Sequence, residues 1–243
     1  YRPSDNADDN QANLFAHKVQ EDLRAILQGP TTLEPKIELD MDLRPEGKNG
    51  PLVRSYASCE EYYRSWASTW EHQALLRARY AAGDAALAED FLMNVADPLR
   101  YPKIDLTEAQ VAEIRKLKAR MEAERLPRGV RRDRHLKLGK GGLSDVEWTI
   151  QLLQLQHAGD NANLRVNGTM QALDELERRK LVSAGDAVVL RRAWWMCTAA
   201  TCGAGASTRR ISCRMTRIRW EDSPSISDTT RIADSISKTI CLP

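Results

Sequence analysis

The stretch Ile37-Glu-Leu-Asp-Met-Asp-Leu-Arg-Pro-Glu-Gly-Lys-Asn-Gly-Pro-Leu-Val-Arg-Ser55 places two acidic residues on a short apolar segment and follows them with basic ones. Side chains alternate between the two faces of a β-strand, so Asp40 and Asp42 would point the same way while the apolar residues around them face the core. This alternation predicts a strand over residues 36–43. The alternative is an exposed edge strand whose polar face is solvated.

The same segment predicts a site for a metal ion and a polyphosphate. Mg²⁺ is bound in proteins by one or two carboxylates together with the phosphates of a substrate. We therefore expect Asp40 and Asp42 to be metal ligands. Arg44 and Arg54 are the candidate phosphate-binding residues, because guanidinium groups form paired hydrogen bonds with phosphate oxygens.

Composition limits the class of protein. The chain has 243 residues, of which 42% are hydrophobic, enough for one large or two small domains. No apolar run approaches the roughly 20 residues that cross a bilayer, and the first residues form neither a signal peptide nor an initiator methionine. A net charge of +2 gives no global field. We expect a globular cytoplasmic piece of a longer protein, without membrane or nucleic-acid partners.

Hydrophobic spacing and capping residues predict a mainly helical chain. A capping box at Thr107 and a Gly-Pro stop after Gln28 mark two helix ends. Trp66 belongs to an aromatic stripe that is expected in the core. A second short strand is predicted at 52–54, so the first part becomes a small sheet packed on helices and the second a helical bundle. The predicted helices are 8–28, 60–80, 85–95, 107–124, 143–157, 169–180 and 183–193.

A glycine-rich turn, Lys137-Leu-Gly-Lys-Gly-Gly142, precedes one of these helices. Glycines before a helix N-terminus can let backbone N–H groups approach a phosphate, although a tight turn is the simpler alternative. Lys137, Lys140 and Asp145 are the candidate binding residues here, and an acid in the first helical turn is also explained by the helix dipole. The basic run from Arg125 to Lys140 has no interleaved aromatic residues, which favours phosphate binding or a solvated surface over nucleic acid.

The last part of the chain differs from the rest. Four of the five cysteines lie between Cys197 and Cys241, at spacings that fit neither a zinc site nor a disulfide framework. Residues 197–243 are rich in Ser, Thr and Arg and show no sustained helical or strand period. We interpret them as an irregular tail read out of frame, because a shift of one base would let the codons of Ser235 to Leu242 encode a helix-like string.

Three segments together resemble the glutamine synthetase adenylyltransferase family. They are Leu39-Asp-Met-Asp-Leu-Arg-Pro-Glu-Gly47, Trp70-Glu-His-Gln-Ala-Leu-Leu-Arg-Ala-Arg79 and His135-Leu-Lys-Leu-Gly-Lys-Gly-Gly-Leu-Ser-Asp-Val-Glu-Trp148. The similarity runs in order from about Tyr1 to about Met196. Together with Glu124-Arg-Leu-Pro-Arg-Gly129, the first segment is most similar to the family's adenylylating unit. Enzymes of this family carry a second, related unit that removes AMP.

The resemblance implies a fold and an activity. The fold would be α+β but predominantly helical, with an incomplete nucleotidyltransferase-type mixed sheet and helices over residues 1–103, a helical bundle over 104–196 and the irregular tail over 197–243. The reaction would transfer AMP from ATP to a tyrosine of glutamine synthetase with Mg²⁺. Asp40 would be a catalytic, metal-binding carboxylate, and a small nitrogen-signalling protein would be a partner.

The resemblance also implies two further carboxylates, from a Gly-Ser followed by Asp-x-Asp, that would precede Tyr1. The chain is therefore expected to be a fragment that is inactive alone. Three alternatives remain open at this point. The segment could be a non-catalytic helical module that binds glutamine synthetase or a neighbouring domain, it could belong to the adenylyl-removing unit, or it could be a non-functional product of a truncated, frame-shifted gene.

Overall fold

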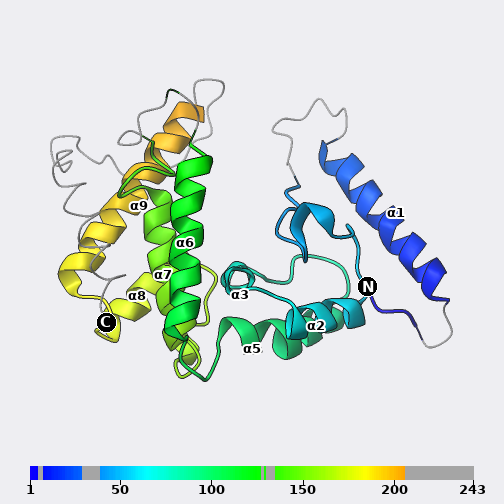
Figure 1. The fold of residues 1–243 in the computed structure, drawn as a ribbon. Coiled ribbons are helices and arrows are strands. Elements are labelled where there is room, and N and C mark those ends of the chain that lie inside the picture. Colours follow the sequence, from blue (N-terminus) through cyan, green and yellow to red (C-terminus); the bar gives the residue numbers. More distant parts are fainter. Residues whose placement is uncertain (5–7, 29–38, 127–128, 130–134, 206–243) are drawn as a thin grey trace. The chain divides into compact units, whose positions relative to one another are not determined.

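The computed structural model describes residues 1–4, 8–28, 39–126, 129 and 135–205. The chain separates into two compact units, Tyr1–Arg100 and Tyr101–Pro243, which are coloured along the sequence in Figure 1. Helices are the regular elements of both units. Within the described residues no helix combines the length and apolar character that a membrane crossing requires.

The described part of the first unit contains seven helical elements. Tyr1 is tied to the unit because its amino group donates to the Arg54 carbonyl at 2.9 Å and its own carbonyl accepts from Tyr56 at 2.7 Å. The elements are α1 (Asp9–Gln28), the short helix η1 (Gly47–Asn49), α2 (Tyr56–Ser65), α3 (Thr69–Leu75), α4 (Ala85–Phe91) and a π-helical segment η2 (Leu92–Ala96) that continues into α5 (Asp97–Arg100).

The core of the first unit lies between α2, α3 and η2. Tyr63, Leu75, Val95 and Ala96 are buried there, and the ring of Phe91 packs edge-on against Tyr63 with centroids 6.0 Å apart. Buried Arg100 fastens the end of α5 to the end of α3, since its guanidinium donates to the carbonyls of Leu75 and Ala78. Helix α1 leaves most of its apolar side chains exposed.

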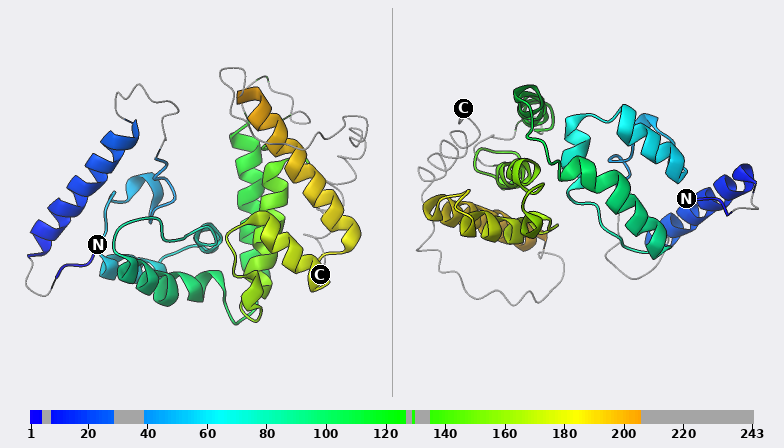
Figure 2. Two further views of the ribbon diagram at one scale, coloured as in Figure 1. Left: turned by 180° about the vertical axis from the view of Figure 1, so that it is seen from behind. Right: turned by 90° about the horizontal axis from the view of Figure 1, so that it is seen from below.

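The second unit is a helical bundle built around α7 (Leu143–His157). It also contains α6 (Glu108–Glu124), the short helix η4 (Ala162–Leu164), α8 (Thr169–Arg178) and α9 (Ala184–Gly205). Helix α7 contacts both α8 and α9, and it lies between α6 and that pair (Figure 1 and Figure 2). Its residues Val146, Ile150 and Leu155 are buried, as are Leu173 and Leu176 of the neighbouring α8, and its contacts with two helices explain why α7 is apolar on more than one side.

The predicted mixed sheet is wrong: the described part of the chain contains no β-strand. Residues 36–38 lie outside the described residues, and residues 39–50 fold back on themselves instead of extending. The Asp40 carboxylate accepts a hydrogen bond from the backbone of Asp42 at 2.9 Å, which closes a turn. Glu46 and Gly47 both have positive φ, so the alternation of acidic and apolar residues reflects a compact turn, and the 52–54 segment is likewise irregular.

Three of the predicted helices also differ in extent from those in the structure. The single helix predicted over 60–80 is two helices, because Ser68 and Glu71 form a second capping box that starts α3, and Trp66 at the break is 75% exposed rather than in the core. The helix predicted at 85–95 continues to Arg100. Helix α9 runs to Gly205, beyond the predicted start of the tail, and its residue Cys197 is buried. Residues 206–243 lie outside the described residues.

Candidate functional site

The two acidic residues of the predicted metal site lie on an exposed turn. One carboxylate oxygen of Asp40 accepts from the Asp42 backbone, and the Asp42 carboxylate lies 3.4 Å from the ammonium group of Lys48. Both aspartates are exposed to solvent. Their remaining oxygens can therefore be ligands for a hard cation such as Mg²⁺. No third acidic, histidine or cysteine ligand gathers with them among the residues that the structure describes.

Arg44 closes the base of this turn. Its guanidinium donates to the carbonyls of Met41 at 2.6 Å, Gly50 at 3.1 Å and Lys48 at 3.2 Å. A β-carbon on Gly50 would lie 2.1 Å from the Pro45 carbonyl oxygen, so the turn is tightly packed at this point. In this conformation the guanidinium of Arg44 binds backbone carbonyls of the chain, and these hydrogen bonds do not include the carboxylates of Asp40 and Asp42.

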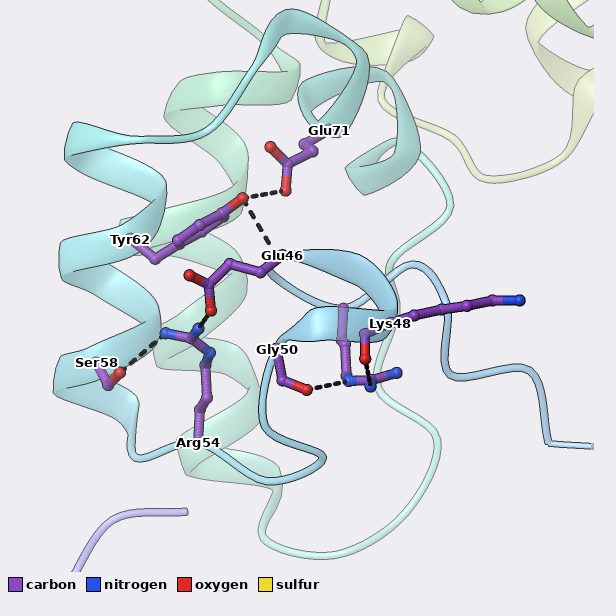
Figure 3. A network of polar contacts seen from close by, with 8 residues as sticks. Glu46, Lys48, Gly50, Arg54, Ser58, Tyr62 and Glu71 are labelled. Carbon is purple, nitrogen blue, oxygen red and sulfur yellow. Dashed lines mark hydrogen bonds and ion pairs between the residues drawn. The ribbon is translucent and has the colours of Figure 1, made fainter. Parts of the chain in front are cut away.

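Arg54 binds at the tip of the same turn. It pairs with the carboxylate of Glu46, donates to the Ser58 hydroxyl at 3.1 Å and stacks over the ring of Tyr62 at 5.3 Å (Figure 3). Only 13% of its side chain is exposed, and its Nε is buried without a hydrogen-bond partner. Arg54, which was predicted to bind phosphate, thus forms an ion pair with a carboxylate of the chain itself.

Tyr62 and Glu71 complete this network, and the sequence reasoning did not identify them. The Tyr62 hydroxyl donates to a Glu71 carboxylate oxygen at 2.8 Å and accepts from the Glu46 backbone N–H at 3.3 Å (Figure 3). The other Glu71 oxygen accepts from the Ser68 backbone at 2.8 Å. Burial, followed by the Glu71 hydrogen bond, raises the pKa of Tyr62. The spacing of Ser68 and Glu71 was a sequence signal for a capping box that could have revealed Glu71.

In the glycine-rich turn of the second unit, backbone carbonyls accept hydrogen bonds from the first N–H groups of α7. The N–H groups of Leu143 and Ser144 donate to the Leu136 and Lys137 carbonyls at 2.8 and 3.0 Å. A β-carbon on Gly142 would lie 2.7 Å from the Leu136 carbonyl oxygen. Glycine is therefore required for packing of the backbone, and these N–H groups are already bonded, as in the tight-turn alternative.

Asp145 is buried beneath this turn. One of its oxygens accepts from the Gly141 backbone at 2.7 Å, and the other pairs with Lys118 of α6. Lys118 also pairs with Glu122. Burial alone would lower the pKa of Lys118, but the charge of Asp145 and the hydrogen bonds that Lys118 donates to Asp145 and Glu122 more than offset this, so the pKa is raised. Asp145 therefore holds the turn to α6.

The structure divides the predicted site residues into exposed and internal groups. Asp40 and Asp42 are exposed in the first unit, and Lys137 and Lys140 are exposed in the second. The internally bonded group consists of Arg44, Arg54 and Asp145. The basic run between Arg125 and Lys140 is described only in part, because residues 127–128 and 130–134 lie outside the described residues.

The comparisons with known proteins match both units. A family model described as "Glutamate-ammonia ligase adenylyltransferase" matches residues 1–94, and one described as "GlnD PII-uridylyltransferase" matches residues 106–202. The chain is 80% identical over 203 residues to the "Bifunctional glutamine synthetase adenylyltransferase/adenylyl-removing enzyme" of Bifidobacterium longum, which covers 84% of this chain and 19% of that relative.

More distant relatives carry the same name. The proteins of Streptomyces avermitilis and Mycobacterium marinum are each 48% identical to this chain over 198 residues, which cover 82% of this chain and 20% of each relative. The chain thus spans about a fifth of the length of the curated relatives that it matches. The resemblance found in the sequence is confirmed.

Proposed function

Because the matched residues belong to the glutamine synthetase adenylyltransferase family, we propose that this chain is part of an enzyme that transfers AMP from ATP to a tyrosine of glutamine synthetase. The identity of 80% over 203 residues is the observation that carries the proposal. The first unit would supply part of the nucleotidyltransferase domain. The second unit, which resembles a uridylyltransferase family in sequence, would help to place the protein substrate.

The exposed charges suit the binding of a nucleotide with a divalent cation. Asp40 and Asp42 would hold Mg²⁺ together with the phosphates of ATP, since one or two carboxylates suffice when the substrate supplies further oxygens. The bound ion would neutralise the charge that develops on the phosphates during transfer. Lys137 and Lys140, both exposed, would be the phosphate-binding residues of the second unit.

The internally bonded residues have a different role in this proposal. Arg44 and Arg54 shape the turn that carries the two aspartates, and Asp145 shapes the turn that carries the two lysines. Of the three carboxylates that the family resemblance implies, this chain contains Asp40, and Asp42 is an additional acid. We therefore propose that the isolated chain binds ATP with Mg²⁺ but transfers AMP poorly. A cytoplasmic location and a PII-type signalling partner follow from the same proposal.

Binding to ATP tests the site in the chain itself. Calorimetry should show ATP binding that requires Mg²⁺, lost in Asp40→Asn and retained in the matched control Glu89→Gln, an exposed carboxylate on α4. Binding that is independent of Mg²⁺ and unaffected by Asp40→Asn would contradict the proposed metal site.

Activity is best tested in a complete enzyme. A hybrid in which the 203 matched residues of this chain replace those of the Bifidobacterium longum relative should attach AMP to glutamine synthetase, detected by intact mass. The same hybrid with Asp40→Asn should not. If instead the hybrid only removes AMP from adenylylated glutamine synthetase, the segment belongs to the adenylyl-removing unit, an activity that the relatives' name also includes.

A further inference from the structure

The turn that carries Asp40 and Asp42 is held in place by contacts at its base and at its tip. Arg44 ties its base through three backbone carbonyls. The tip is formed by Glu46, a non-glycine residue with φ of 63°. Such a left-handed conformation is disfavoured for L-residues and persists only where surrounding contacts impose it. The contacts around Glu46 therefore decide whether the turn keeps this shape.

Glu46 is held through both its backbone and its side chain. Its N–H donates to the Tyr62 hydroxyl, and that hydroxyl donates its own proton to Glu71 at 2.8 Å (Figure 3). Glu71 is 5% exposed and is fixed by the start of α3 through Ser68. The Tyr62 proton is thus directed at Glu71, which leaves an oxygen lone pair for Glu46.

The side chain of Glu46 makes the second connection. Its carboxylate pairs with Arg54, whose guanidinium also donates to Ser58 and lies over the Tyr62 ring. Both connections end on α2, so the tip of the turn is attached to one face of that helix. Lys48, two residues beyond Glu46, lies 3.4 Å from the Asp42 carboxylate, so a displaced tip would also change the charge beside Asp42.

We propose that Tyr62 and Glu46 are positioning residues for the divalent-cation site of Asp40 and Asp42. This inference rests on the proposed function, because it requires those two aspartates to bind a metal ion. Tyr62 and Glu46 do not contact the ion themselves. They hold the turn in the shape in which Asp40 caps the Asp42 backbone and both carboxylates face solvent.

A competing explanation is that Glu46 occupies the place of a phosphate on Arg54. In that case Arg54 would be released to the nucleotide when Glu46 is displaced. The enclosure of Arg54 argues against it, because its side chain is 13% exposed and its Nε is buried. A phosphate would reach this guanidinium only after the Tyr62 and Ser58 contacts had opened.

The test is the affinity of the chain for Mn²⁺ alone, measured by electron paramagnetic resonance well below the melting temperature. Tyr62→Phe keeps the ring over which Arg54 stacks but removes the hydroxyl, and we expect Mn²⁺ binding to weaken about tenfold, the lower end of effects seen when residues that orient metal ligands are changed. The matched control Tyr56→Phe removes a hydroxyl from the same helix that contacts Asp90, with its oxygen 3.5 Å from the Asp90 carbonyl. It should leave the affinity unchanged.

The outcomes separate the two proposals. If Asp40→Asn binds Mn²⁺ as well as the unchanged chain does, the metal site of the proposed function fails. If Asp40→Asn abolishes binding but Tyr62→Phe equals Tyr56→Phe, only the positioning role fails. A role in stability alone would lower the melting temperature of Tyr62→Phe without changing its Mn²⁺ affinity or spectrum.

Glu46→Gln tests the competing explanation directly. It removes the charge that pairs with Arg54 but keeps the backbone N–H that donates to Tyr62. We expect weaker Mn²⁺ binding and no gain in affinity for ATP without metal. Tighter binding of metal-free ATP would mean that Glu46 stands in for a phosphate, and it would overturn the positioning proposal.

Discussion

The turn that carries Asp40 and Asp42 in the first unit and the glycine-rich turn at residues 137–142 in the second are each stabilised by a charged side chain. The two stabilising residues have opposite charges. In the first, Arg44 supplies donors to three carbonyls of the turn. In the second, Asp145 supplies an acceptor to the Gly141 N–H and pairs with Lys118 of a neighbouring helix. In both turns a charged residue expected to meet a ligand binds the backbone, while neighbouring charged residues remain exposed. A charged residue in a loop can therefore stabilise the conformation of the loop instead of binding a ligand.

The two turns differ in how deeply the charged residue is buried, and this predicts the largest effect. Lys118→Met would leave Asp145, whose side chain is 9% exposed, without its cation. Breaking a buried pair in this way costs about 3–5 kcal/mol. Urea denaturation followed by circular dichroism should show the loss. The exposed Lys116 on the same helix provides the control Lys116→Met, which should change stability little.

The same pair predicts a dependence on alkaline pH. The folded-state pKa of Lys118 is raised above its ordinary value of 10.5, so its contribution to stability is complete below the unfolded pKa and is lost as pH rises through the folded pKa. The stability difference between the unchanged chain and Lys118→Met should stay constant through neutral pH and shrink only above about 10.5. A difference that disappeared between about pH 6 and 8, well below that value, would contradict this assignment.

A smaller effect is expected from the glycine that packs the second turn. In Gly142→Ala the new methyl group would meet the Leu136 and Gly139 carbonyl oxygens at 2.7 and 2.8 Å. Overpacking of this kind costs about 1–3 kcal/mol. Gly185→Ala is the contrasting variant, because its methyl group would have only the Ser183 hydroxyl near it, at 3.9 Å. It should be neutral or stabilising when the two melting curves are compared.

In the first unit, the substitution Arg44→Lys tests whether the hydrogen bonds of Arg44 stabilise the turn. An ammonium group cannot reach three divergent carbonyls as a guanidinium does, and we expect a loss of about 1–2 kcal/mol, typical of a few net hydrogen bonds. Urea unfolding curves would measure it. Arg64→Lys, at an exposed pair with Glu61, should have no measurable effect. Equal stability of the two variants would mean that the Arg44 contacts do not define the turn.

The smallest effects on stability are expected at the exposed lysines. Lys140→Ala should leave the melting temperature unchanged, because Lys140 is exposed. Its affinity for ATP with Mg²⁺ should fall by about fivefold or less, since an exposed charge contributes at most about 1 kcal/mol. Calorimetry would detect the change. An unchanged affinity in a Lys137→Ala, Lys140→Ala double variant would mean that these residues do not bind the nucleotide.

Much of the helical architecture was predictable from local signals. The capping box of Thr107 and Gln110 placed the start of α6, and hydrophobic spacing gave α7 its observed limits, Leu143 and His157. The split between α2 and α3 was missed, although Ser68 and Glu71 encode it. The continuation of α9 to Gly205 was missed, because the residues after Cys197 show no sustained helical period, whereas Cys197 itself is buried in the structure.

Strand formation was the main error, and it has a physical cause. Alternating polar and apolar residues predict a strand only if a neighbouring strand accepts its backbone hydrogen bonds. Around Asp40 the partners that the structure describes are a side chain of the same turn and the guanidinium of Arg44. The pattern alone could not distinguish these partners from a sheet.

The sequence by itself determined the family, most helix limits and the identity of the charged residues, because those depend on residue type and on spacing along the chain. Only the tertiary structure decided which charges are exposed. Arg54 is covered by Tyr62 and neutralised by Glu46, and Asp145 is covered by α6 and neutralised by Lys118. Each partner lies at least eight residues away in the sequence, so desolvation and pairing depend on how the helices pack.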